Sequence, residues 1–255
     1  MTEVVSRRFG FAFWSFILFM SALTALFVGL GVWQVERLSW KEALIAQVTA
    51  RSTAPPVALP SATEWPTTDF GALAFAPVTL SGTWVPSGTV LVFTSLTTPK
   101  GPVAGPGYWV VTPFAVASGT VFVNRGFIPQ AAAEQFKQGG TLPTGEQNIS
   151  GVLVAAEAVD AFTPAADTAK RIDWIRNPSR LATLAGVTGP VMPALVDLPA
   201  TKPGDLPQGG ETMVDFPNNH LGYAMTWFGL AIALVGFYLA LVWRRMRPEP
   251  LKDLT

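Results

Sequence analysis

The sequence predicts an integral membrane protein in which two transmembrane α-helices flank an extracytoplasmic α+β domain with a mostly antiparallel sheet. Two uncharged apolar runs lie near the ends of the chain, at residues 9–35 and 221–243. Charged residues make up only 13% of the 255 residues, whereas a soluble domain carries about 25%. Short β-rich segments separated by turn residues fill the stretch between the two runs.

The first apolar run contains no charged residue between Arg8 and Glu36. A bilayer core of about 30 Å needs roughly 20 helical residues, so this run is long enough to span with some tilt. It is longer than the roughly 7–15 apolar residues of a signal peptide, and no small-residue cleavage site follows it. The sequence therefore predicts a retained transmembrane helix at residues 9–35, with residues 40–49 continuing the helix out of the membrane.

Basic residues predict the orientation of this first helix and of a second transmembrane helix at residues 220–243. Short flanks rich in Lys and Arg stay in the cytoplasm. The intervening segment, residues 36–219, holds 11 basic and 14 acidic residues, a net charge of −3. We therefore expect residues 1–8 and 244–255 in the cytoplasm of a bacterium, with the central domain in the periplasm; in a mitochondrion it would face the intermembrane space. The terminal basic residues are Arg7, Arg8, Arg244, Arg245, Arg247 and Lys252.

Five segments of the central domain have the composition of β-strands. Residues 77–84 alternate apolar and polar side chains and end at the turn Pro86-Ser87-Gly88. Residues 89–94 follow this turn and are expected to pair with the first segment as a hairpin. The other expected strands are residues 108–112, 120–124 and 149–154. Weaker helical patterns lie at residues 130–138 and 178–185, and residues 53–68 are predicted to be a linker or extended loop.

Composition excludes several classes of function. The chain has no cysteine, which rules out disulfides, thiolate metal sites and cysteine nucleophiles. Its net charge of +0 gives no indication of nucleic-acid binding. A single histidine cannot form a His cluster for zinc, and its place at the membrane edge makes a Ser–His–Asp triad implausible. The glycines of residues 101–107 lack the lysine and helix start of a nucleotide loop. The sequence therefore predicts a protein that is not an enzyme.

That single histidine, His220, opens the second apolar run. Asn218 or Asn219 is a suitable N-cap, which places His220 in the first helical turn. The positive end of the helix dipole disfavours an imidazolium there, and a neutral ring is what iron ligation requires. Two interpretations stay open at this stage: a polar residue at the membrane interface, or an axial ligand of a haem iron.

The second helix divides into a small-residue face and an aromatic face. Small residues recur at spacings of three or four, which lets two membrane helices approach closely. We expect this stripe to pack on the first helix, while the aromatic face meets lipid, a partner helix or a porphyrin. The stripe comprises Gly222, Thr226, Gly229, Ala233, Gly236 and Ala240, and its expected partners are Ser15, Ala22, Ala25 and Gly29. The aromatic face comprises His220, Tyr223, Trp227, Leu234 and Tyr238.

Four motifs follow one another along the chain. Residues 31–41 read G-V-W-Q-V-E-R-L-S-W-K, and residues 77–84 read P-V-T-L-S-G-T-W. The third joins G-P-G-Y-W-V-V-T-P-F at residues 105–114 to V-N-R-G-F-I-P at residues 123–129. The fourth leads from G-G-E-T into N-N-H-L-G-Y-A-M-T-W-F-G-L-A, which ends at Ala231. In this order the motifs resemble the Surfeit locus protein 1 family, the assembly factors of haem–copper terminal oxidases such as cytochrome c oxidase.

The resemblance implies that the chain binds haem a and assists its delivery to oxidase subunit I. It implies His220 as the axial ligand, with Tyr223 and Trp227 packed on the porphyrin. Arg125 and Arg37 are candidates for contacts to the haem propionates. Two other roles stay open for these arginines: Arg125 could belong to a strand-ending turn with Gly126 at positive φ, and Arg37 could meet lipid phosphates.

The resemblance also implies the partners of the chain. They are subunit I of cytochrome c oxidase, haem A synthase and the lipid bilayer, with no nucleic acid. An alternative function stays open, in which the chain is a membrane scaffold that stabilises subunit I during assembly and touches no haem.

Overall fold

The computed structural model describes residues 10–212 and 218–246. These residues divide into a helical unit, residues 10–46 and 218–246, and a β-rich unit, residues 47–212. The basic residues Arg7, Arg8, Arg247 and Lys252, on which the predicted orientation partly rests, lie outside the described residues.

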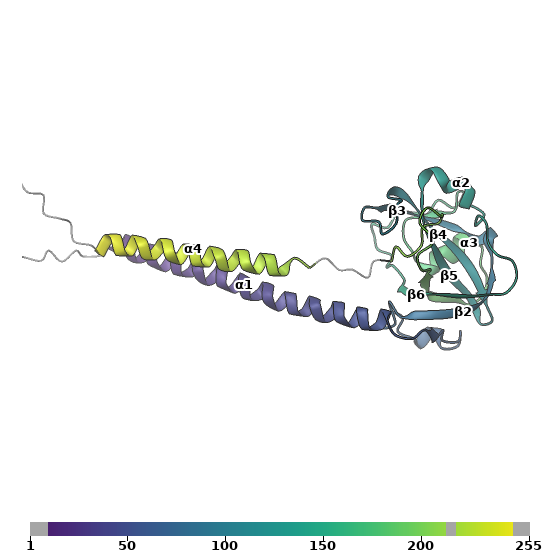
Figure 1. Ribbon diagram of the computed structural model, residues 1–255, viewed down its shortest axis with the longest axis horizontal. Helices are drawn as coiled ribbons and strands as arrows, with labels where there is room; N and C mark the ends of the chain where they lie inside the picture. Colours follow the sequence, from purple (N-terminus) through teal and green to yellow (C-terminus); the bar gives the residue numbers. More distant parts are fainter. Residues whose placement is uncertain (1–9, 213–217, 247–255) are drawn as a thin grey trace, which may run out of the picture. The chain divides into compact units, whose positions relative to one another are not determined.

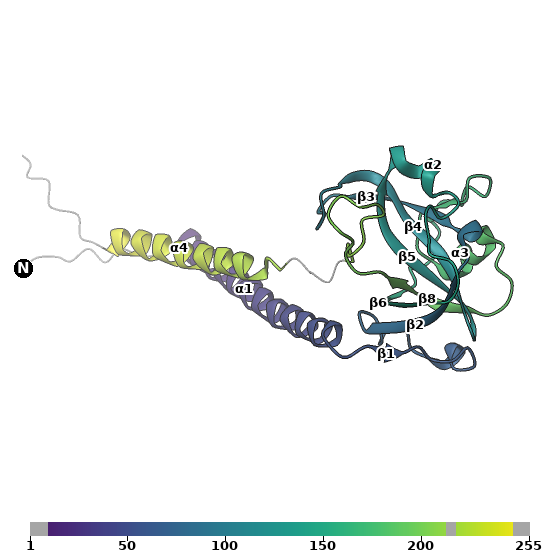
Figure 2. The ribbon, with the colours of Figure 1, turned by 45° about the vertical axis from the view of Figure 1, so that its right-hand side comes forward.

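Two long helices confirm the predicted membrane architecture. Helix α1 (Phe11–Ser52) and helix α4 (His220–Met246) are both apolar and long enough to cross a bilayer. Helix α1 contains residues 40–49, as expected, and within the helical unit the two helices lie side by side (Figures 1 and 2). Aliphatic side chains, free of Asp, Glu, Lys and Arg over a full span, are what allow these segments to form helices in lipid.

All five predicted strands are present in an eight-stranded, mostly antiparallel sheet, with the order β1-β2-β6-β8-β5-β4-β3-β7. The predicted strand at residues 77–84 matches β2 at both ends. Strand β8 was not predicted because Pro193 interrupts it, and proline removes a ladder hydrogen bond. The structure places this proline where the pairing with β5 changes register. The strands are β1 (Val57–Ala58), β2 (Pro77–Trp84), β3 (Val90–Leu96), β4 (Gly105–Val116), β5 (Gly119–Pro129), β6 (Gln147–Ala155), β7 (Ile172–Asp173) and β8 (Val191–Asp197).

The expected hairpin between residues 77–84 and 89–94 is wrong. Strands β2 and β3 do not pair; each pairs with a different half of β4, through Trp84↔Phe114 and Val90↔Val111. The reason lies at the turn, where the Val85 N–H donates to the carbonyl of Pro113 at 2.9 Å and keeps the chain beside β4. The 3-10 turn η2 (Pro86–Gly88) then carries the chain onward. The pairing of β2 with β4 closes a ring, β2-β6-β8-β5-β4, around the core.

The inward side chains of this ring form the main core of the β-rich unit. Period-two alternation along the strands sends every second residue inward, and in strand β2 this buries Val78 and Leu80. Phe114 of strand β4 and Val123 of strand β5 are fully buried in the same cluster. Large apolar side chains of this kind each stabilise the fold by about 1.5–3 kcal/mol when buried.

The short helices agree with the helical patterns of the sequence. Helix α3 (Pro178–Ala185) has the predicted bounds, with the Asn177 side chain accepting hydrogen bonds from the N–H groups of Ser179 and Arg180. Residues 130–138 form the 3-10 turn η3 (Gln130–Ala132) and the four-residue helix α2 (Ala133–Phe136). The predicted linker, residues 53–68, contains only β1 and the 3-10 turn η1 (Trp65–Thr67).

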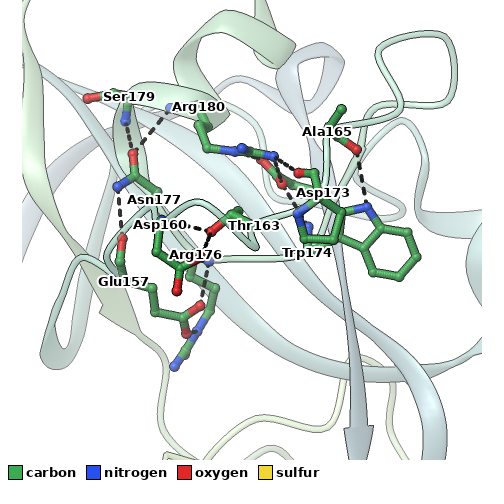
Figure 3. Close-up of polar contacts among 11 residues, drawn as sticks. Glu157, Asp160, Thr163, Ala165, Asp173, Trp174, Arg176, Asn177, Ser179 and Arg180 are labelled. Carbon is green, nitrogen blue, oxygen red and sulfur yellow. Dashed lines mark hydrogen bonds and ion pairs between the residues drawn. The ribbon is translucent and has the colours of Figure 1, made fainter.

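Polar contacts hold the loop between β6 and α3 (Figure 3). Asp173 is fully buried, and Arg180 donates to its two carboxylate oxygens from Nε at 2.9 Å and from Nη2 at 2.6 Å. The Arg176 Nε donates to Glu157 Oε1 at 2.9 Å, and its Nη1 donates to Asp197 Oδ2 at 3.3 Å. These pairs fix a loop that has little regular structure of its own.

Candidate functional site

The helical unit is an antiparallel pair in which aromatic and small side chains alternate along the contact. The rings of Phe27 and Trp227 have centroids 5.6 Å apart. A Cβ atom at Gly31 would lie 2.6 Å from the ring of Phe228. Since helix α4 begins beside the later part of the α1 span and ends beside Phe13, the two helices run in opposite directions.

The predicted packing face of helix α4 is wrong. Its small residues Gly222, Gly229 and Gly236 have no atom of another element within 4 Å of a built Cβ, and the expected partner Gly29 is equally open. Helix α4 instead packs on α1 through the buried residues Ala224 and Ala231. A small residue is required where the partner helix presents a large ring. Here α1 supplies the small residue, Gly31, and α4 supplies the ring of Phe228. His220 and Trp227 therefore face α1, and the small stripe faces away.

His220 is hydrogen-bonded to a residue of the other helix. Its Nδ1 lies 2.8 Å from Oε1 of Gln34, a residue of α1 whose side chain is 8% exposed. His220 is the first residue of α4 and is half-buried. Among the described residues, the structure shows no hydrogen-bond partner for its Nε2. An amide oxygen only accepts, so a neutral ring donates from Nδ1 and keeps the lone pair on Nε2.

Gln34 is the residue of this site that sequence analysis did not single out. It belongs to the G-x-W-Q motif at the end of the first apolar run, but the sequence does not give the register between two helices. The signal that identifies it is chemical: an amide side chain near the end of an uncharged membrane span is costly unless it has a hydrogen-bonding partner.

The other predicted haem contacts are distributed over both units. Trp227 lies half-buried against Phe27, whereas Tyr223 is 57% exposed on the outer side of α4. Arg37 lies three residues beyond Gln34 on α1 and is exposed, with its guanidinium carbon 4.1 Å from the centre of the Trp40 ring. The structure thus places His220 and Trp227 on the face of α4 that packs against α1, where His220 meets Gln34 of α1.

Arg125 lies in the β-rich unit and has structural contacts there. Its guanidinium donates to the carbonyls of Gly139 and of Thr141, the latter at 3.2 Å, and so fixes that turn. Burial lowers the pKa of Arg125 to about 10. Gly126 has the expected positive φ, +131°, but the predicted strand end is wrong, because β5 continues to Pro129. The side chain also borders a hollow of about 430 Å³.

The residues of the helix pair fit one axial haem ligand. A metal-bound imidazole usually donates its second N–H to an acceptor, which fixes the tautomer and the ring orientation. His220 has such an acceptor in Gln34, and aromatic side chains lie within two turns of it. Among the described residues no cluster of three or more His, Cys, Asp or Glu that could hold a metal ion is present.

Comparison with known proteins gives a consistent result. A model described as the SURF1 family matches residues 21–232, a range that includes both Gln34 and His220. The Surfeit locus protein 1 of Rattus norvegicus is 34% identical over 233 residues, covering 86% of this chain and 72% of its own. The human protein of that name is 32% identical over 239 residues, covering 87% and 75%. A SURF1-like protein of Monosiga brevicollis is 28% identical over 249 residues, covering 92% and 89%.

Proposed function

The chain belongs to the SURF1 family, and we therefore propose that it is an assembly factor for a haem–copper terminal oxidase such as cytochrome c oxidase. In this proposal the chain binds haem a and assists its delivery to subunit I, without covalent chemistry on the haem and without enzymatic activity. The observation that supports haem binding most directly is the hydrogen bond between Gln34 and His220, because it leaves Nε2 of the ring with a lone pair.

Each predicted residue has a defined part in this proposal. His220 would hold the haem iron through Nε2. The exposed ring of Tyr223 is free to pack on the porphyrin, and Trp227, which packs against Phe27 of α1, would meet it only at the edge that stays accessible. Arg37 and Arg125 are available to carboxylates, either the haem propionates or acidic groups of a partner, because arginine binds carboxylates in a bidentate manner. A single strong ligand suits a protein that has to release what it binds.

The two apolar helices support a location in a membrane. We propose a bacterial inner membrane protein with both termini in the cytoplasm and the β-rich domain in the periplasm. The Lys and Arg residues that flank the spans support this orientation. The proposed partners are subunit I and haem A synthase, met in the bilayer or at its periplasmic surface.

A scaffold that stabilises subunit I without haem is the second candidate. The same contact favours this candidate. The hydrogen bond between Gln34 and His220 joins two membrane helices, and this structural role alone can account for the presence of both polar side chains. In that case His220 has a structural role, and haem loading is not part of the function.

The optical spectrum of the detergent-purified chain separates the two candidates. The chain is co-expressed with the enzymes that make haem a, as wild type and as His220→Ala. A reducible haem a spectrum in the wild type, lost or shifted in the variant, supports haem delivery with His220 as ligand. A colourless wild type, although haem a is present in the same membranes, supports the scaffold. Tyr223→Phe serves as a control that keeps the ligand.

A further inference from the structure

We propose that Gln34 is a positioning residue for His220: its amide oxygen holds the ring in the Nδ1–H tautomer and aims Nε2 away from helix α1. The role of this tautomer in binding iron rests on the proposed function. The tautomer itself is a property of the chain and can be measured with no haem present.

Gln34 is a buried amide on the first membrane helix. Gln34 is 8% exposed, the helical turn before it is apolar, and its Oε1 is 2.8 Å from Nδ1 of His220. A buried amide without a hydrogen-bond partner is costly, so this contact favours a ring that can donate. Of the two tautomers of a neutral imidazole, only the one protonated at Nδ1 donates to Gln34.

The backbones of both His220 and Gln34 are held in place by helix packing. His220 begins helix α4, where the Tyr223 N–H donates to the carbonyl of Asn219 at 3.3 Å, so its backbone is held by the first helical turn. Gln34 projects from α1 one turn after Gly31, whose lack of a side chain lets Phe228 approach. Because each side chain comes from a packed helix, the bond sets the rotation of the imidazole as well as its proton.

The consequence for a ligand at Nε2 is electronic as well as geometric. Donation from Nδ1 to an acceptor raises the basicity of the opposite nitrogen, and loss of such acceptors typically lowers metal affinity by about 10- to 100-fold. A carboxylate at position 34 accepts the same hydrogen bond more strongly, whereas an isosteric apolar side chain accepts none. The strength of the hydrogen-bond acceptor at position 34 is therefore greater than in the wild type in Gln34→Glu, and it is zero in Gln34→Met.

The first experiment uses the fact that His220 is the only histidine of the chain. The chain is labelled with ¹⁵N-histidine, purified in detergent without haem and studied by NMR, and the tautomer is read from the ¹⁵N signals of the neutral ring. We expect the wild type and Gln34→Glu to be protonated at Nδ1, and Gln34→Met to lose that preference. Gln47→Met, an exposed position on the same helix, is the matched control and leaves the signal unchanged. Protonation at Nε2 in the wild type would overturn the proposal even if Gln34→Met fails to fold.

The second experiment measures haem a binding by the same variants. We expect Gln34→Met to bind about 10- to 100-fold more weakly, and Gln34→Glu to retain binding with a shifted absorption band. If His220→Ala loses haem but Gln34→Met keeps wild-type affinity and bands, the proposed function stands and the positioning role is refuted. If the wild type shows the Nδ1–H tautomer but binds no haem a, the tautomer stands and the haem function is refuted.

Discussion

The ring of Phe228 lies directly on the backbone of Gly31, so that a Cβ atom at position 31 would be 2.6 Å from ring atom Cε1. Carbon atoms that are not bonded do not approach so closely, and only glycine fits this contact. Gly31 precedes Gln34 by one helical turn. The glycine therefore brings the two helices close enough for the direct hydrogen bond between Gln34 and His220.

A larger residue at position 31 is expected to break that bond. In Gly31→Leu the side chain displaces the ring of Phe228 and separates α4 from α1, so the ¹⁵N signal of His220 changes as it does in Gln34→Met. Gly29→Leu, two residues earlier and open on all sides, is the control and leaves the signal unchanged. Identical spectra for the two glycine variants would show that Gly31 does not set the helix contact.

Gly126→Ala is expected to destabilise the β-rich unit. Gly126 has φ of +131°, and a Cβ there would lie 2.3 Å from the carbonyl oxygen of Gln208. Strain and overlap together cost about 3 kcal/mol or more, a fall of several degrees in the thermal midpoint by near-UV circular dichroism. The control, Gly105→Ala, has φ of +93° and open space, and costs only about 1 kcal/mol. Equal losses would mean that the overlap with Gln208 relaxes freely.

Arg180→Ala is expected to cost much more than the loss of a surface ion pair. It leaves the fully buried carboxylate of Asp173 without its cation. Breaking such a pair costs about 3 kcal/mol, the lower end of the usual range, because Arg180 itself is partly exposed. Lys170→Ala removes an exposed pair with Asp167 and is expected to cost less than about 1 kcal/mol. Chemical unfolding in detergent measures the stability loss of each variant. A loss for Arg180→Ala as small as that for Lys170→Ala would refute the prediction that the buried pair matters more.

Asp197 is expected to contribute a specific pH dependence to stability. Burial, opposed by the ion pair with Arg176, raises the pKa of this carboxyl above its ordinary 3.8. The folded state then binds the proton more tightly than the unfolded state. This contribution stabilises the fold fully at pH values below the unfolded-state pKa, and it is lost as the pH rises through the higher folded-state pKa. Asp197→Asn cannot titrate, so the wild type should lose stability relative to this variant as the pH rises from about 4 towards neutral. A pH-independent difference would contradict the raised pKa.

The absence of cysteine makes the orientation directly testable by labelling. Ser95→Cys places a single thiol on the exposed surface of the β-rich unit, and Met246→Cys places one at the end of α4. We expect a membrane-impermeant maleimide to label Ser95→Cys on intact spheroplasts and Met246→Cys only after permeabilisation. The reverse pattern would place the domain in the cytoplasm and contradict the proposed orientation.

Sequence reasoning was most successful where local physics decides the structure. The bounds of β2 and α3 follow from alternation and from the Asn177 cap, and the two spans follow from the absence of charge. It failed where a distant partner decides. The turn after Trp84 gives no indication that β4 is twelve residues long, enough for β2 and β3 to pair with it end to end along the same edge. A stripe of small residues likewise does not reveal which helix supplies the large ring.

The candidate site shows the same division. His220 was identified by its type and by its place at the start of a span, both local properties. Gln34 belongs to a sequence motif, but its role depends on the register between the two helices, which only the packed pair defines. Arg125 was interpreted as part of a turn or as an anion contact. The structure gives it contacts to the turn at Gly139 and Thr141, and its possible anion remains a prediction.

The closure of the sheet through β2 and β4 restricts how the domain can recognise a partner. A chain that binds by strand addition needs a long row of free N–H and C=O groups at a sheet edge. In the described residues the terminal strands of the sheet, β1 and β7, are only two residues long. They offer little template for a further strand, which also protects the domain against edge-to-edge aggregation. If the chain recognises an oxidase subunit as proposed, we expect side chains to make most of the contacts, so that substitutions on the surface of the ring change partner specificity.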